Sequence, residues 1–96
     1  MIIEQASLRI KTGAEDEFIT SLQQALPIIE RAKGLISYQM IRNIENPHLF
    51  IFIVRWETLE DHIEHFVKSE DFKKWNAAIV PYFAGEPEVL HFDEII

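Results

Sequence analysis

Two histidines three positions apart, His62 and His65, are the residues best suited to acid–base chemistry. Histidine changes charge near neutral pH, so it can take up and release a proton under physiological conditions. Leu59, His62 and Phe66 follow one another at helical spacing, which sets His62 at the edge of an apolar stripe facing a cleft. We predict His62 as a catalytic base, the alternative being a hydrogen-bonded histidine at the margin of a core. His65 is the second catalytic candidate, with a solvent-exposed helix histidine as its alternative.

Several aromatic side chains could line a substrate pocket beside these histidines. Phe72 and Trp75 share one helical stripe, and an indole also brings a hydrogen-bond donor that needs a partner. Each of these side chains has an ordinary alternative role in core packing or, for His91, in the polar face of a strand. The predicted substrate-binding residues are Tyr38, Trp56, Phe66, Phe72, Trp75 and His91.

A metal site is a weaker alternative at the same two histidines. They stand at i and i+3 with Glu57 or Glu64 nearby, but two histidines without a third fixed ligand do not define a metal site. The chain has no cysteine, which excludes disulfides, thiolate catalysis and cysteine-based metal centres. We therefore expect no metal site.

The first half of the chain alternates strand and helix patterns. Residues 2–10 show the period of two that is typical of a strand, and residues 12–15 have the spacing of a capping box. A helix with an apolar stripe follows, in which Pro27 predicts a kink or early fraying, and Gly34 ends the segment. Residues 35–42 and 49–57 form strands joined by the polar turn 43–47, which predicts a hairpin.

The second half supplies the histidines and most of the aromatic residues. Thr58 can cap a short helix that runs to about Val67, and Ser69 can cap another over residues 70–82, which Pro81 ends. Residues 89–95 read as a fourth strand. The element order predicts an α+β, ferredoxin-like split βαβ fold with a four-stranded antiparallel sheet, βαββααβ.

The strand at residues 49–56 is apolar on both faces, with Leu49, Ile51 and Ile53 on one side and larger side chains on the other. An antiparallel sheet usually exposes one face to water, so helices should cover one face and a second sheet the other. With so short a chain, that second sheet belongs to another copy. We predict a homodimeric α+β barrel.

Length and charge exclude several classes of function. The chain has 96 residues, which fits a single domain over residues 1–96, and 48 % of them are hydrophobic, as in a folded protein. A net charge of −7 repels the phosphate backbone, so we expect no nucleic-acid partner. No stretch has the length of a membrane span or the pattern of a secretion signal, so we expect a cytoplasmic protein with no membrane partner.

Several short motifs, taken in order along the chain, resemble the antibiotic biosynthesis monooxygenase family of small dimeric α+β barrels. They are Lys11-Thr12-Gly13, Glu17-Phe18, Gly34-Leu35-Ile36-Ser37-Tyr38, Asn46-Pro47, Arg55-Trp56-Glu57, and then His62 or His65 ahead of Ser69, Phe72 and Trp75. The resemblance covers nearly the whole chain. It implies a monooxygenase acting on a small or medium aromatic or quinol with dioxygen, through a general base and without a cofactor.

The resemblance also implies how such an oxygenase works. The substrate is an electron-rich phenol or hydroquinone whose anion reduces dioxygen directly, so the protein supplies a base, an apolar pocket and polar groups for the oxygens. The haem-degrading branch of the family is disfavoured, because its Asn, Trp and His set is absent and Ser7 stands near the Asn position. The alternative is a non-catalytic, dimeric ligand-binding or stress-related domain of the same fold.

Overall fold

The computed structural model describes residues 1–96 as one antiparallel sheet backed by helices. The elements are β1 (Ile2–Arg9), α1 (Glu15–Glu30), β2 (Leu35–Arg42), β3 (Leu49–Trp56), the π-helix η1 (Asp61–Phe66), α2 (Glu70–Ile79), the 3-10 turn η2 (Val80–Tyr82) and β4 (Glu88–Asp93). The strand order is β2-β3-β1-β4, and each neighbouring pair is antiparallel. The predicted ferredoxin-like fold is confirmed, including the β2–β3 hairpin.

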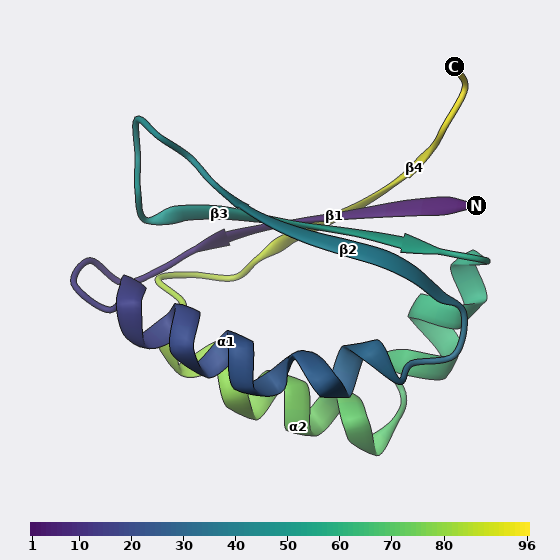
Figure 1. The fold of residues 1–96 in the computed structure, drawn as a ribbon, viewed down its shortest axis with the longest axis horizontal. Coiled ribbons are helices and arrows are strands. Elements are labelled where there is room, and N and C mark those ends of the chain that lie inside the picture. Colours follow the sequence, from purple (N-terminus) through teal and green to yellow (C-terminus); the bar gives the residue numbers. More distant parts are fainter.

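The core lies between the sheet and the two α-helices, which run side by side across one face of the sheet (Figure 1). Strand alternation sends one set of β1 and β3 side chains toward the helices, and helix α1 meets them with an apolar stripe at three- and four-residue steps. The buried members on the strands are Ala6, Leu8, Phe50, Phe52, Val54 and Trp56, and those on α1 are Phe18, Leu22, Ala25 and Ile29.

Helix α1 departs from the prediction at both ends. Ala14, not Thr12, is the N-cap residue, and it makes no side-chain cap. The predicted capping box does not form, and the carboxylate of Glu15 instead accepts a hydrogen bond of 2.7 Å from the Gly13 amide in the preceding turn. The predicted fraying at Pro27 is wrong, because the helix continues to Glu30. Burial of Ile29, which is 2 % exposed, stabilises the turn beyond the proline.

The segment after β3 forms a wider helix than the α-helix expected from the sequence. The Thr58 hydroxyl accepts a hydrogen bond of 3.1 Å from the Asp61 amide, which confirms the predicted cap. The next six residues then form a π-helix, in which the amide of Val67 donates to the carbonyl of His62 at 2.9 Å. Single π-turns often mark functional sites, and this one carries His62.

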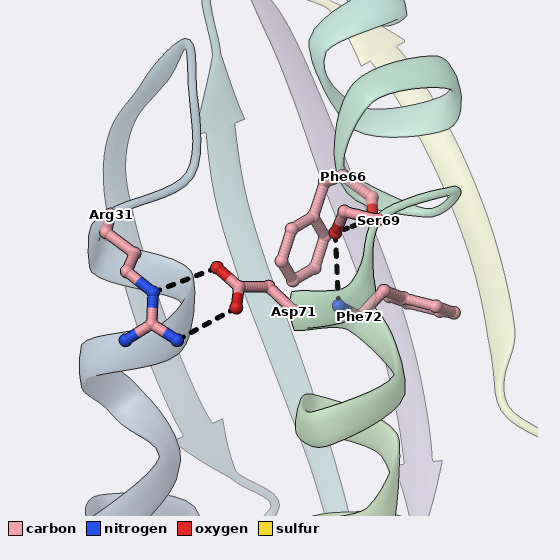
Figure 2. Close-up of polar contacts among 5 residues, drawn as sticks. All are labelled: Arg31, Phe66, Ser69, Asp71 and Phe72. Carbon is pink, nitrogen blue, oxygen red and sulfur yellow. Dashed lines mark hydrogen bonds and ion pairs between the residues drawn. The ribbon is translucent and has the colours of Figure 1, made fainter.

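Helix α2 is fixed at its start by two side-chain contacts (Figure 2). The Ser69 hydroxyl accepts from the Phe72 amide at 3.1 Å and donates to the Phe66 carbonyl at 2.6 Å, so the predicted cap is confirmed. Arg31, just after α1, makes a bidentate ion pair with Asp71 at 2.9 and 2.8 Å. The helix ends at Ile79, ahead of Pro81 as predicted, and continues as the 3-10 turn η2.

The opposite face of the sheet carries no helix (Figure 1). Strand β3 contributes Leu49, Ile51 and Ile53 to this outer face, and β4 adds Leu90 and Phe92, which are 48 % and 44 % exposed. The register sets Ile53 and Leu90 on either side of Gln5 of β1. Strand β4 is shorter than predicted, ending at Asp93, and no helix of the chain is both long and apolar enough to cross a membrane.

Candidate active site

A cavity of about 360 Å³ opens between the inner face of the sheet and the helices η1 and α2. Most of its wall is apolar, and the ionisable side chains on it are only Glu4, His62 and His91. Such a hollow, with a few convergent polar groups, is the usual form of a small-molecule site. Its apolar wall includes Ala6, Leu8, Phe52, Phe66, Phe72, Trp75 and Ile79, and Asn76 contributes an amide.

Glu4 is a carboxyl group inside the core. It lies on the same face of β1 as Ala6 and Leu8, so its side chain points toward the helices, and the residue is 7 % exposed. The indole Nε1 of Trp56 donates a hydrogen bond of 3.0 Å to Glu4 Oε1. Burial raises the pKa of Glu4 to about 7, and the bond from Trp56 opposes part of this rise.

His62 packs against both of these side chains from the π-helix. The residue is 6 % exposed, and its ring stacks on Trp56 with ring centroids 5.2 Å apart and an interplanar angle of 19°. His62 Nε2 lies 3.3 Å from Glu4 Oε1, and Nδ1 lies 2.8 Å from Nε2 of His91. Burial, together with the nearby His91, lowers the pKa of His62 to about 4. Burial therefore favours the neutral form of both Glu4 and His62.

His91 completes this cluster from β4. The antiparallel register pairs His91 directly with Glu4 of β1, so both side chains point to the inner face of the sheet. His91 is exposed in this structure, whereas Glu4 and His62 are buried. The three residues, which we call the Glu4–His62–His91 cluster, thus run from the core toward the surface.

Three of the predicted aromatic residues lie on the cavity wall. Trp75 stacks on Phe52 with centroids 5.6 Å apart, and Phe66 meets Phe72 edge-to-face at 5.5 Å. The Ser69 cap and the Arg31–Asp71 ion pair position Phe72 and the start of α2 (Figure 2). The structure therefore brings Phe66, Phe72 and Trp75 together with His62 and His91 around one hollow.

Three other predicted residues lie away from this wall. His65 is half exposed and hydrogen-bonds Asp61 at 3.0 Å. Tyr38 donates to the carboxylate of Glu30 at 2.6 Å beside a separate apolar hollow between α1 and β2. Trp56 is fully buried behind His62 and reaches the cavity only through Glu4.

Glu4 is the site residue that the sequence reasoning missed. A signal was present in the sequence, since Glu4 lies on the same inner face of β1 as Ile2, Ala6 and Leu8 and is the only charged side chain on that face. A single charge within an apolar register marks a carboxyl that needs a buried partner. The partners, Trp56 and His62, come from β3 and η1.

The arrangement is suited to proton transfer in an apolar environment. A carboxyl with a pKa near neutrality can accept a proton from a weakly acidic ligand, and the imidazoles beside it can carry that proton onward. No group of three or more histidine or acidic side chains is arranged to hold a metal ion.

Comparison with known proteins places the chain in a family. The sequence profile described as antibiotic biosynthesis monooxygenase matches residues 1–78. The chain belongs to the antibiotic biosynthesis monooxygenase family. The resemblance noted in the sequence is thereby confirmed, and a monooxygenase-like fold is what the chain shares with its relatives.

Two individual proteins align with the chain over nearly its whole length. The chain is 39 % identical over 95 residues to the uncharacterized protein YczJ of Bacillus subtilis, covering 99 % of this chain and 100 % of YczJ. A putative antibiotic biosynthesis monooxygenase from Bordetella bronchiseptica superposes with a TM-score of 0.95 at 34 % identity, over 99 % and 97 % of the two chains.

A more distant structure shares the fold alone. SnoaB, a cofactor-independent oxygenase from Streptomyces nogalater, was crystallised as a mutant and superposes with a TM-score of 0.84. The two chains are 14 % identical, and the superposition covers 99 % of this chain and 93 % of SnoaB.

Proposed function

We propose that this protein is a cofactor-independent monooxygenase that oxidises a small or medium aromatic substrate of the phenol or quinol type with dioxygen. The reaction begins when the substrate hydroxyl loses its proton to a general base centred on His62. The observation that carries the proposal is the Glu4–His62–His91 cluster on the wall of an otherwise apolar cavity. Family membership supports the same chemistry.

The cavity fits a substrate of this kind in size and in chemistry. Its volume of about 360 Å³ lies at the lower end of small-ligand sites, which span roughly 300–1,000 Å³. Trp75 and Phe72 offer flat apolar surfaces against which an aromatic ring can stack, and Asn76 can hydrogen-bond a ring oxygen. The apolar wall also keeps water from an oxygenated intermediate.

The electrons for the reaction come from the substrate itself. Loss of the hydroxyl proton gives an aryloxide, which transfers an electron to dioxygen, and the two radicals recombine into a carbon–oxygen bond. Breakage of the peroxide bond leaves one oxygen on the ring as a quinone carbonyl. The other oxygen leaves as water with two hydrogens from the substrate. The protein has to supply the base, the orientation and the dry site.

A second copy of the chain is the partner that we propose for the outer face of the sheet. This face carries Leu90 and Phe92, which are exposed, and Ile51 and Ile53, which are partly exposed, and no helix covers it (Figure 1). Contiguous exposed apolar side chains of this kind mark interaction surfaces. Two such sheets packed face to face form the homodimeric barrel predicted from the sequence.

A second candidate function is a non-catalytic ligand-binding domain. It is favoured by the cavity wall, because 12 of the 17 lining residues are hydrophobic and would hold an apolar ligand without any reaction. The two functions differ in their requirement for the ionisable cluster. Binding alone would survive its neutralisation, whereas oxygenation would not.

The test is oxygen consumption by the purified, metal-free protein across a panel of quinols and hydroxylated polycyclic aromatics. His62→Gln is the test variant, and His65→Gln is the matched control because that ring lies outside the cavity. Uptake that is lost in His62→Gln and kept in His65→Gln supports the oxygenase. Saturable binding of the same compounds with no uptake in the wild type would replace it with the ligand-binding function.

A further inference from the structure

Neither ring nitrogen of His62 is free to meet a substrate. Nε2 faces Glu4 Oε1 at 3.3 Å, and Nδ1 faces His91 Nε2 at 2.8 Å. The flat face of the ring is stacked on Trp56, which fixes its orientation. A substrate hydroxyl could reach His62 directly only by displacing Glu4 or His91. The histidine at the centre of the cluster is therefore placed to pass a proton between two neighbours.

One carboxyl oxygen of Glu4, Oε2, makes no side-chain contact with the cluster or with Trp56. Both of its side-chain contacts, to Trp56 Nε1 and to His62 Nε2, are made by Oε1. The lone pairs of Oε2 are therefore available to a hydroxyl in the cavity, whose wall Glu4 forms in part. The bond from Trp56 holds the carboxyl in position.

Burial decreases along the cluster in the direction of the solvent. Glu4 and His62 are almost fully buried, and His91 is exposed at the far end. No other ionisable side chain lines the cavity, so a proton that reaches Glu4 has His62 as its one ionisable neighbour on that wall.

We propose that Glu4 Oε2 is the atom that receives the substrate proton and that His62 and His91 form a relay that carries it to solvent. The inference rests on the proposed oxygenase function and refines its base. Glu4 is the catalytic residue in contact with substrate, and His62 and His91 act behind it.

The relay requires one particular tautomer of His62. In its neutral form the proton sits on Nδ1 and is donated to His91 Nε2, which leaves Nε2 to accept from the protonated carboxyl of Glu4. The carboxyl group of Glu4 first turns about its Cγ–Cδ bond, so that the newly protonated oxygen faces Nε2 of His62. Transfer from Glu4 to Nε2 and from Nδ1 to His91 then leaves Glu4 as a carboxylate and puts the positive charge on the exposed ring. Release from His91 to water completes the transfer. The Nδ1–H tautomer of His62 is restored between turnovers, when Nε2 loses its proton to water in the empty cavity and Nδ1 takes up a proton from solvent through His91, and no electrons move.

Nitrogen-15 NMR of the histidine rings tests the relay without any substrate. The expected result is a neutral His62 with the Nδ1–H tautomer at about pH 6, whose signals shift in both Glu4→Gln and His91→Gln but not in His65→Gln. Glutamine keeps the shape of Glu4 and can still accept from Trp56, and His91 is exposed, so at least the second variant spares the core. A His62 that responds to neither variant, or that carries its proton on Nε2, would overturn the relay.

Turnover separates failure of the relay from failure of the proposed function. With an active substrate, Glu4→Gln should lower kcat/KM by about 10²- to 10⁴-fold, the usual contribution of a general base. His91→Gln should lower kcat with little change in KM, and millimolar imidazole in the buffer should restore it. If the NMR signals of His62 shift in both variants but no compound causes oxygen uptake, the hydrogen-bonded relay stands and the oxygenase function is refuted. If oxygen uptake is unaffected by Glu4→Gln, the relay alone is refuted.

Discussion

Glu4 Oε1 lies 3.3 Å from His62 Nε2, and the two side chains are 9 % and 8 % exposed. Burial has opposite effects on their pKa values, raising that of the carboxyl and lowering that of the imidazole. The pair is therefore most stable with both members neutral. At a pH above the pKa of Glu4, its carboxyl group becomes a buried carboxylate beside the neutral His62, and this carboxylate is the form that accepts a proton.

The first prediction concerns stability against pH. The pKa of Glu4 is higher in the folded than in the unfolded chain, so the folded state holds the extra proton and stability falls as pH rises through about 7. Glu4→Gln removes this loss. From about pH 5.5 to 8.5, the unfolding free energy of Glu4→Gln relative to wild type should rise by about 2 kcal/mol, at about 1.36 kcal/mol per pKa unit.

Urea titrations at the two pH values measure this difference. The opposite dependence of His62, whose lowered pKa makes stability fall as pH drops from about 6.5 to 4, is present in both proteins and largely cancels. A difference in free energy that stays constant with pH would show that Glu4 titrates as an ordinary surface carboxyl.

The second prediction concerns the indole behind the cluster. The hydrogen bond from Trp56 lowers the pKa of Glu4, so Trp56→Phe should raise it further above 7. The carbonyl stretch of the protonated carboxyl in the infrared, followed against pH, reports this shift. Trp75→Phe is the matched control, since Trp75 lines the cavity but makes no bond to Glu4. If the carboxyl group titrates at the same pH in Trp56→Phe and in wild type, the hydrogen bond from the indole has no effect on the pKa of Glu4.

The third prediction concerns Gly34, in the turn between α1 and β2. Its φ of +81° is costly for other residues, and an added Cβ would collide with the side chain of Asp61 at the start of the π-helix. Gly34→Ala should destabilise the fold by roughly 2–4 kcal/mol, as strain and overpacking add.

Gly13→Ala separates the two causes. Gly13 also has a positive φ, of +91°, but nothing lies within 4 Å of an added Cβ, so only the backbone strain should appear. Thermal unfolding of the two variants gives the comparison. Equal losses of stability would mean that the Asp61 contact does not constrain the turn.

The fourth prediction concerns the outer face of the sheet. Ile53→Glu places a charge in the middle of the apolar surface that we assign to a second copy, and it should convert a dimer into a monomer in sedimentation velocity at micromolar concentration. Ile44→Glu makes the same change in the β2–β3 turn, where Ile44 is 90 % exposed, and it should leave the dimer intact. A wild-type protein that sediments as a monomer would contradict the assignment.

The sequence predicted the fold well because the signals are local. Strand alternation, the Thr58 and Ser69 caps and the hairpin turn at residues 43–47 each depend on neighbouring residues, and the element order then leaves few topologies.

The site was predicted only in part because its geometry depends on contacts distant in the sequence. His62 and His65 have equivalent spacing in an α-helix, but the π-helix turns one ring into the core and leaves the other near the surface. The role of Glu4 needs the register between β1 and β4, which sets it beside His91. No pattern within β1 alone gives that register.

The most direct test of the central claim is oxygen consumption measured against pH for wild type and Glu4→Gln with one aromatic hydroxyl substrate. We predict that kcat/KM of the wild type rises with pH through about 7, as the buried carboxyl of Glu4 ionises, and that Glu4→Gln loses both this rise and most of the rate. A profile that is the same in both proteins would contradict the claim that the Glu4–His62–His91 cluster is the base.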